Sequence, residues 1–136
     1  MASETDWTYS AQADEARRGS QALLTGSEDW RLLSDIMQPR QHIDIVLPKN
    51  TYDAFVNTGL EAMLREGGVA RTVILGVVTN MCCETTARSS FCRGFHTYFV
   101  SDAVGSDNVD IAQGSLKALA LAFGPVVTTK EMLEIL

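Results

Sequence analysis

Signals for β-strands and for helices alternate along most of this sequence. Residues 71–78 form a nearly continuous apolar run, as in strands that are covered on both faces. Shorter β-rich runs occur at residues 43–48, 96–102 and 125–129. Alternation of this kind implies right-handed βαβ crossovers. We therefore expect an α/β fold of three layers, α/β/α, with a parallel, Rossmann-like open sheet whose strands centre near Ile45, Ile74, Phe99 and Val127.

The segments between these runs have the apolar spacing of helices. We expect helices over residues 57–68, 82–93 and 108–123, and a last one after residue 128. Thr58 with Glu61, and Thr128 with Glu131, have the spacing of a capping box. Residues 1–25 have no such pattern, and we expect an irregular N-terminal segment there, followed by one domain at residues 26–136.

Charge and hydropathy argue against two kinds of binding partner, nucleic acids and membranes. The net charge is -6, and Lys and Arg are not clustered as a nucleic-acid surface would require. No stretch approaches the roughly 18 apolar residues of a membrane span, and the first residues lack the apolar core of a signal peptide. We expect a cytoplasmic protein that acts on a small-molecule substrate and binds neither nucleic acid nor a membrane.

The number and spacing of the cysteines and histidines do not suit a metal site. The chain has three cysteines, an odd number that does not suit a disulfide framework. Cys82 and Cys83 are adjacent and lack the two-residue gap of a zinc knuckle, and His42 and His96 are the two histidines of the sequence. We expect no metal site and no cofactor.

The order of strands assigns polar residues to one edge of the sheet or the other. Parallel α/β sheets bind ligands at the carboxyl ends of their strands. Lys49, residues 79–82 and Asp102 follow strands and share that edge, whereas His42 and His96 precede strands. A helix of about 12 residues, roughly 18 Å long, separates Cys82 from His96. A Cys-His protease pair is therefore not expected.

Cys82 is the candidate nucleophile at this edge. A cysteine in the first turn of a helix lies at the positive end of the helix dipole, and a nearby lysine favours the thiolate further. Cys83, about 100° further round the helix, should face the sheet, and Cys92 lies near the far end of the helix. The alternative for all three is a buried structural thiol, and position alone does not decide between the two.

Two motifs carry a family resemblance over roughly residues 26–136. Lys49 is followed by Tyr-x-x-Phe, and "GVVTNMCCETTAR" contains Gly-x-x-Thr-Asn-x-Cys, continuing into Glu-x-Thr-Ala-Arg. Their order resembles that of the isochorismatase-like cysteine hydrolases, which include nicotinamidases, N-carbamoylsarcosine amidohydrolases, ureidoacrylate hydrolases and isochorismatases. The resemblance therefore implies a hydrolase that acts on a small amide through a Cys thioester.

Matched position by position, the resemblance assigns roles to particular residues. It makes Cys82 the nucleophile and Lys49 the triad lysine beside it. It also implies a cis peptide bond between Val77 and Val78. The backbone N–H groups of Val78 and Cys82 would then form an oxyanion hole.

Other residues near this edge have two interpretations each. Tyr52 and Phe55 are candidates for the substrate pocket, and packing in the core is the alternative for both. Asn80 is a third pocket candidate, and it could instead cap the helix that carries Cys82. For Asp102 the favoured interpretation is a helix or turn cap.

The sequence departs from the family at its start. Members begin with a strand ending in an aspartate, which supplies the acid/base of an Asp-Lys-Cys triad. Asp6, Asp14 and Asp29 do not follow apolar runs, so we expect that the family's first two strands and the triad Asp are missing.

Two hypotheses about function remain open. The chain is either a hydrolase impaired by the loss of that Asp, or a degenerate, non-catalytic member that works through homo- or hetero-association. Sheet edges exposed by the missing strands would favour a homo-oligomer.

Overall fold

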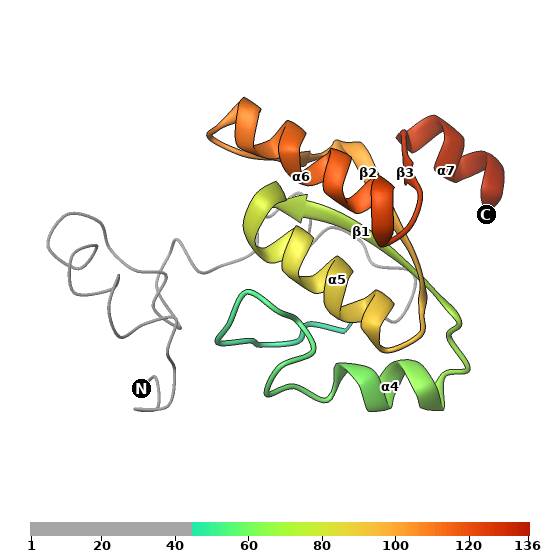
Figure 1. Cartoon of the computed structure of the whole chain (residues 1–136). Helices are drawn as coiled ribbons and strands as arrows, with labels where there is room; N and C mark the ends of the chain where they lie inside the picture. The colour runs from blue at the N-terminus through green and yellow to red at the C-terminus, as the bar shows by residue number, and fades with distance from the viewer. Residues whose placement is uncertain (1–44) are drawn as a thin grey trace, which may run out of the picture. The chain divides into compact units, whose positions relative to one another are not determined.

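The computed structural model describes residues 45–136, and the chain divides into two compact units, residues 1–50 and 51–136. The described helices and strands all belong to the second unit (Figure 1). In chain order they are α4 (Leu60–Glu66), β1 (Arg71–Val77), η1 (Thr79–Cys83), α5 (Glu84–Cys92), β2 (His96–Gly105), α6 (Val109–Ala122), β3 (Val126–Val127) and α7 (Thr129–Ile135). The irregular segment predicted at 1–25 and the domain boundary after it lie outside the described residues.

The sheet is parallel, with the strands in the order β1-β2-β3. Ile74 of β1 lies opposite Phe99 of β2, which in turn lies opposite Val126 of β3. The register of β1 shifts between Ile74 and Gly76, where the ladder is irregular. Three predicted strands and their parallel pairing are thereby confirmed, and with them the α/β fold class.

The fourth predicted strand, centred near Ile45, is wrong for the part of it that the structure describes. Residues 45–49 have no regular secondary structure, and Ile45 and Val46 are 60% and 56% exposed. A strand is stable where a neighbouring strand takes up its backbone hydrogen bonds. No strand of residues 45–136 pairs with this segment, so its β-branched residues are not enough to make it a strand.

The core lies between the sheet and helices α5 and α6, which pack against each other in front of the sheet in Figure 1. Side chains alternate between the two faces of a strand, and β2 turns Thr97 and Phe99 to this face. Phe99 is 2% exposed and packs in one cluster with Cys83, Ala87 and Leu119. A single apolar cluster therefore joins the sheet to η1, α5 and α6.

A buried hydroxyl group fixes α5 on the sheet beside this cluster. Ser90 of α5 is 0% exposed. Its oxygen lies 2.7 Å from the Thr72 hydroxyl of β1 and 2.9 Å from the Thr97 hydroxyl of β2. Buried polar groups need such partners, so the three hydroxyls set the position of α5 across both strands.

One of the two predicted capping boxes is present. The Thr128 backbone N–H donates to Glu131 Oε2 (2.7 Å) and the Glu131 N–H donates to Thr128 Oγ1 (3.3 Å) at the start of α7. The box predicted for Thr58 and Glu61 is wrong, because α4 has no side-chain cap and the Glu61 carboxylate accepts a hydrogen bond from Arg93 instead (3.0 Å). A tertiary contact here replaces a local one.

Candidate active site

Cys82 lies directly beyond the carboxyl end of β1. The helical segment after β1 begins with the π-helical turn η1 and continues as α5. Cys82 is in η1 and is half-buried, whereas the adjacent Cys83 is 5% exposed and packs in the core cluster. Cys92 is exposed at the far end of α5. The expectation that Cys83 faces the sheet is confirmed.

The backbone around this turn has two unusual features. The peptide bond between Val77 and Val78 is cis, as the family resemblance implies. The Val78 carbonyl oxygen accepts the N–H of both Met81 and Cys83, each at 3.2 Å. π-helical turns are rare and are often found at functional sites. The sequence did not predict this turn, because five residues are too few to show a periodicity.

Asn80 ties this turn to the loop before α6. Its carboxamide oxygen accepts a hydrogen bond from the Ser106 hydroxyl (2.7 Å), and it makes no side-chain cap at the start of η1. The Ser106 oxygen in turn accepts the backbone N–H of Asn108 (3.3 Å), which caps α6 through its own side chain. Asn80 therefore connects the segments that follow β1 and β2.

Asp102 is engaged at the start of α7. Its Oδ1 accepts the Thr129 backbone N–H (2.7 Å) and the Thr129 hydroxyl (2.8 Å). Hydrogen bonds from the side chain and then the backbone of Thr129 lower the pKa of Asp102 below its ordinary value. The carboxylate is thus held ionised as a helix cap, which is the interpretation that the sequence favoured.

The loop that contains Tyr52 and Phe55 packs against α5. Tyr52 is 38% exposed, and its carbonyl oxygen accepts a hydrogen bond from the Thr86 hydroxyl (3.3 Å). Phe55 is 6% exposed and stacks on Phe95, with ring centroids 6.0 Å apart. Sequence reasoning did not single out Thr86, although it stands in the quoted Thr-Ala-Arg motif, because the residues that it contacts are more than 30 positions away.

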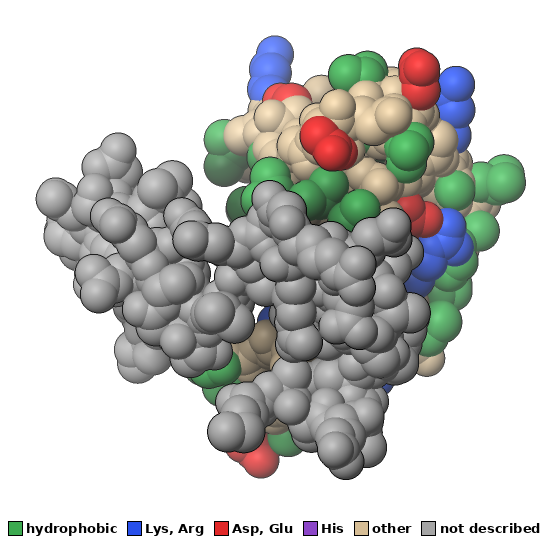
Figure 2. Space-filling model, turned by 90° about the vertical axis from the view of Figure 1, so that its left-hand side faces the viewer, with side chains coloured by type: hydrophobic (Ala, Val, Ile, Leu, Met, Phe, Trp, Pro, Cys, Tyr) green, Lys and Arg blue, Asp and Glu red, His purple; other side chains and the backbone are tan. Residues whose placement is uncertain are grey.

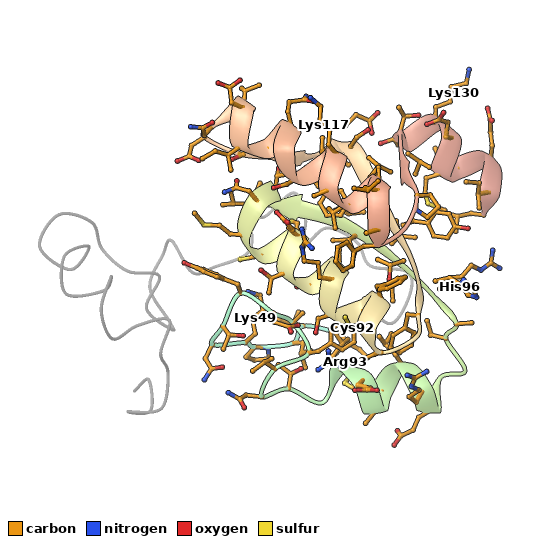
Figure 3. All side chains as sticks on the ribbon, viewed as in Figure 1. Lys49, Cys92, Arg93, His96, Lys117 and Lys130 are labelled. Atoms are coloured by element: carbon orange, nitrogen blue, oxygen red, sulfur yellow. The ribbon has the colours of Figure 1, made fainter. Side chains whose placement is uncertain are left out.

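The structure bears differently on Lys49 and on His96. Lys49 is exposed and belongs to the first compact unit, whereas Cys82 belongs to the second, so the pairing of the two stays a prediction. His96 is the first residue of β2 and lies at the right-hand end of the sheet in Figure 3. The arrow of β1 points to the left-hand end in Figure 1, so His96 is at the amino edge, as expected.

The remaining surface features of the described residues do not mark a second site. A hollow of about 170 Å³ opens at the amino ends of the strands, below the roughly 300 Å³ usual for ligand pockets. It is lined by Phe91, Phe95, His96, Thr97, Tyr98, Phe123, Gly124 and Pro125. On the face shown in Figure 2, acidic, basic and apolar side chains of residues 45–136 are interspersed.

The same part of the chain has neither a metal cluster nor a membrane span. Residues 45–136 contain no group of three or more His, Cys, Asp or Glu side chains that could hold a metal ion. None of the helices within that range is long and apolar enough to cross a membrane.

Comparison with known proteins places this arrangement in a family. The model of the isochorismatase domain matches residues 4–131. The chain belongs to the isochorismatase family. It is 37% identical over 105 residues to nicotinamidase 3 of Arabidopsis thaliana, an alignment that covers 77% of this chain and 53% of that protein. The chain therefore spans about half the length of this curated relative.

Solved structures of the family have the same fold. A cysteine hydrolase from Pseudomonas syringae pv. phaseolicola superposes with a TM-score of 0.81 at 28% identity, over 96% of this chain and 64% of that one. A nicotinamidase from Bacillus subtilis superposes with a TM-score of 0.72 at 26% identity, over 79% of this chain and 62% of that one. Both likenesses agree with the α/β fold and with the family assignment.

Proposed function

We propose that this chain is a cysteine hydrolase that breaks the C–N bond of a small amide, with Cys82 as its nucleophile. The observation that carries the proposal is the placement of Cys82, half-buried in a helical turn at the carboxyl edge of a parallel sheet. Ligands of open α/β sheets bind at that edge. The named activities of the relatives, nicotinamidase and cysteine hydrolase, support the same reaction class.

The proposed reaction is an acyl transfer in two steps. The Cys82 thiolate attacks the carbonyl carbon, and the N–H groups of Val78 and Cys82 hold the resulting oxyanion. The oxyanion collapses, the C–N bond breaks and the leaving nitrogen takes a proton from water, since none of residues 45–136 is assigned as a general acid. Water then hydrolyses the thioester, which releases a carboxylic acid and regenerates the thiolate. Lys49 favours the thiolate through its positive charge.

The proposal assigns residues to substrate contact but does not assign Asp102 as the general acid. Tyr52, whose side chain is partly exposed, and Asn80 contact the substrate in this proposal, and the buried Phe55 anchors the loop that carries Tyr52. Asp102 does not serve as the general acid, because its Oδ1 already accepts two hydrogen bonds from Thr129 and its pKa is lowered. We expect slow turnover, because the sequence predicts that the family's triad aspartate is missing.

The alternative is a non-catalytic family member that works by association with other chains. Exposed apolar side chains on β1 favour it, since Leu75 and Val77 are 61% and 72% exposed. In this alternative, Cys82 and Lys49 remain in the sequence without a catalytic task.

Release of ammonia or amine from nicotinamide and from ureido-type amides distinguishes the two. We expect slow release by the chain, and a rate about 10² to 10⁴-fold higher when a family-type strand ending in aspartate is added before residue 1. Cys82→Ala should abolish release in both forms, and Cys92→Ala should leave it unchanged. Full turnover without the added strand would contradict the prediction that the general acid is missing. Turnover that survives Cys82→Ala would contradict the assignment of Cys82 as the nucleophile.

A further inference from the structure

The segment that follows Lys49 is a compact turn with its own hydrogen bonds. The Asp53 carboxylate accepts the backbone N–H of Phe55 (2.8 Å), and the Thr51 hydroxyl donates to the Asp53 carbonyl oxygen (3.0 Å). Asx turns of this kind hold a short segment in one conformation. These hydrogen bonds therefore hold residues 51–55 in one conformation. The position of the turn relative to α5 then depends on its contacts with that helix.

Its attachment to the helix of Cys82 is the hydroxyl group of Thr86. This oxygen accepts the backbone N–H of Ala54 (3.1 Å) and donates its own hydrogen to the carbonyl oxygen of Tyr52 (3.3 Å). A hydroxyl can donate and accept at once, which a methyl group cannot do. One side chain of α5 thereby satisfies two backbone groups of the turn.

A second contact fixes the far side of the turn at the end of α5. The ring of Phe55 stacks on Phe95, and the Arg93 guanidinium lies 4.8 Å from the Phe55 ring centroid. In Figure 3 Arg93 lies at the end of α5 that is nearest to α4. Glu61 of α4 in turn accepts a hydrogen bond from Arg93 (3.0 Å). With one contact at each end, the turn cannot slide along the helix without losing one of them.

The position of Thr86 connects this attachment to the candidate nucleophile. Cys83 and Ala87, four residues apart, are 5% and 0% exposed and face the core together. Cys82 and Thr86 stand one position before each of them and so share the adjacent side of the helical segment. Both are half-buried. The turn that Thr86 holds thus lies along the side of α5 that continues from Cys82.

We propose that Thr86 is a positioning residue, whose hydroxyl holds the turn at residues 51–55 in register with the helix of Cys82 and so places Tyr52 and, three positions earlier in the chain, Lys49. The inference rests on the proposed function, since it assumes that Lys49 and Cys82 act together. Thr86 does not touch the substrate or the reacting atoms, and its effect on the thiolate passes entirely through the turn.

Three variants of the full chain separate the hydroxyl from the bulk of the side chain. Thr86→Val keeps the shape and removes both hydrogen bonds, and Thr86→Ser keeps the hydroxyl. Thr85→Val is the matched control, because Thr85 makes no side-chain hydrogen bond within the described part of the chain. Amide hydrogen exchange at Ala54 should become about two- to tenfold faster in Thr86→Val and stay unchanged in the other two.

The functional readout is the pH profile of Cys82 alkylation by iodoacetamide, with Lys49→Met as reference. Because a cation favours the thiolate, Lys49→Met should slow alkylation at pH 7 by about tenfold or more. Thr86→Val should slow it by about threefold or more, and both profiles should move to higher pH. Thr86→Ser and Thr85→Val should follow the wild type.

Each contrary outcome has a distinct meaning. If Lys49→Met slows alkylation and Thr86→Val does not, the positioning role is overturned and the proposed function stands. If Lys49→Met has no effect, the proposed pairing of Lys49 with Cys82 fails, and the positioning of Lys49 fails with it. If Thr86→Val does not fold, Thr86→Ser still decides, since slow alkylation with the hydroxyl retained would overturn the proposal.

Discussion

Neighbouring residues of this chain differ sharply in their surroundings, and the two adjacent cysteines are the clearest case. Cys83 packs against Phe99 and Leu119 in the core cluster, whereas Cys82, one position earlier, is half-buried outside it. One step along an α-helix turns a side chain by about 100°, and the π-helical turn that carries both cysteines likewise points neighbouring side chains in different directions. That rotation is why the sequence alone could predict which of the two faces the sheet.

The same contrast between core and surface predicts the effect of two leucine substitutions in α6. Leu119 is 1% exposed and Leu121 is 87% exposed, although both are leucines in one helix. Leu119→Ala should lower the free energy of unfolding by about 2 to 5 kcal/mol, because it leaves a cavity in the core cluster. Leu121→Ala should change it by less than about 0.5 kcal/mol. Urea unfolding followed by circular dichroism measures both, and equal effects would contradict the placement of the core.

At the scale of elements, the attachment of α7 predicts a dependence of stability on pH. Hydrogen bonds from Thr129 lower the pKa of Asp102, and hydrogen bonds from Thr128 lower the pKa of Glu131. A carboxyl group whose pKa is lower in the folded state stabilises that state above its ordinary pKa, and this contribution is lost as pH falls toward the lowered value. The free energy of unfolding should therefore decrease below about pH 4.

Asp102→Asn separates this effect from general acid unfolding. The amide keeps an acceptor oxygen for Thr129 but has no charge to lose, so the variant should be less stable at pH 6 and lose less stability between pH 5 and pH 3. Urea unfolding at a series of pH values measures the difference. Asp107→Asn is the control, since Asp107 makes no contact with α7 among the described hydrogen bonds. Equal slopes for Asp102→Asn and the wild type would contradict the assignment.

Elements with strong local signals could be predicted from the sequence, and those set by distant residues could not. The strands around Ile74 and Phe99 and the capping box at Thr128 have their causes within a few positions. Glu61 is different, because its partner Arg93 is 32 residues away. The strand predicted at Ile45 failed for a related reason, since β propensity does not supply a neighbouring strand.

In the candidate site, too, features with local causes could be predicted from the sequence and those set by distant residues could not. Its edge of the sheet, the burial of Cys83 and the cap role of Asp102 follow from the order of elements and from local chemistry. The links from Thr86 to Tyr52 and from Ser106 to Asn80 join segments more than 25 positions apart. The spacing of residues in the sequence does not predict such long-range contacts.

For the whole molecule, the exposed edge of the sheet predicts self-association. β1 is an edge strand of the described sheet, and its Leu75 and Val77 are 61% and 72% exposed. Edge strands with apolar side chains tend to pair with other chains. Sedimentation equilibrium should detect oligomers of the full chain, and the double variant Leu75→Lys/Val77→Lys should shift the chain toward monomer. Leu133→Lys, at a residue 68% exposed on α7, should not. A monomer at every concentration would contradict the prediction.

Competition among the three thiols of one molecule shows whether Cys82 is the nucleophilic cysteine. The chain is treated at pH 7 with less than one equivalent of iodoacetamide, and the label on each cysteine is measured by peptide mass spectrometry. Exposure alone would favour Cys92, which is exposed, over the half-buried Cys82. We predict that the first label falls mainly on Cys82, because the helix start and the proposed neighbour Lys49 favour its thiolate. A first label mainly on Cys92 or Cys83 would contradict it.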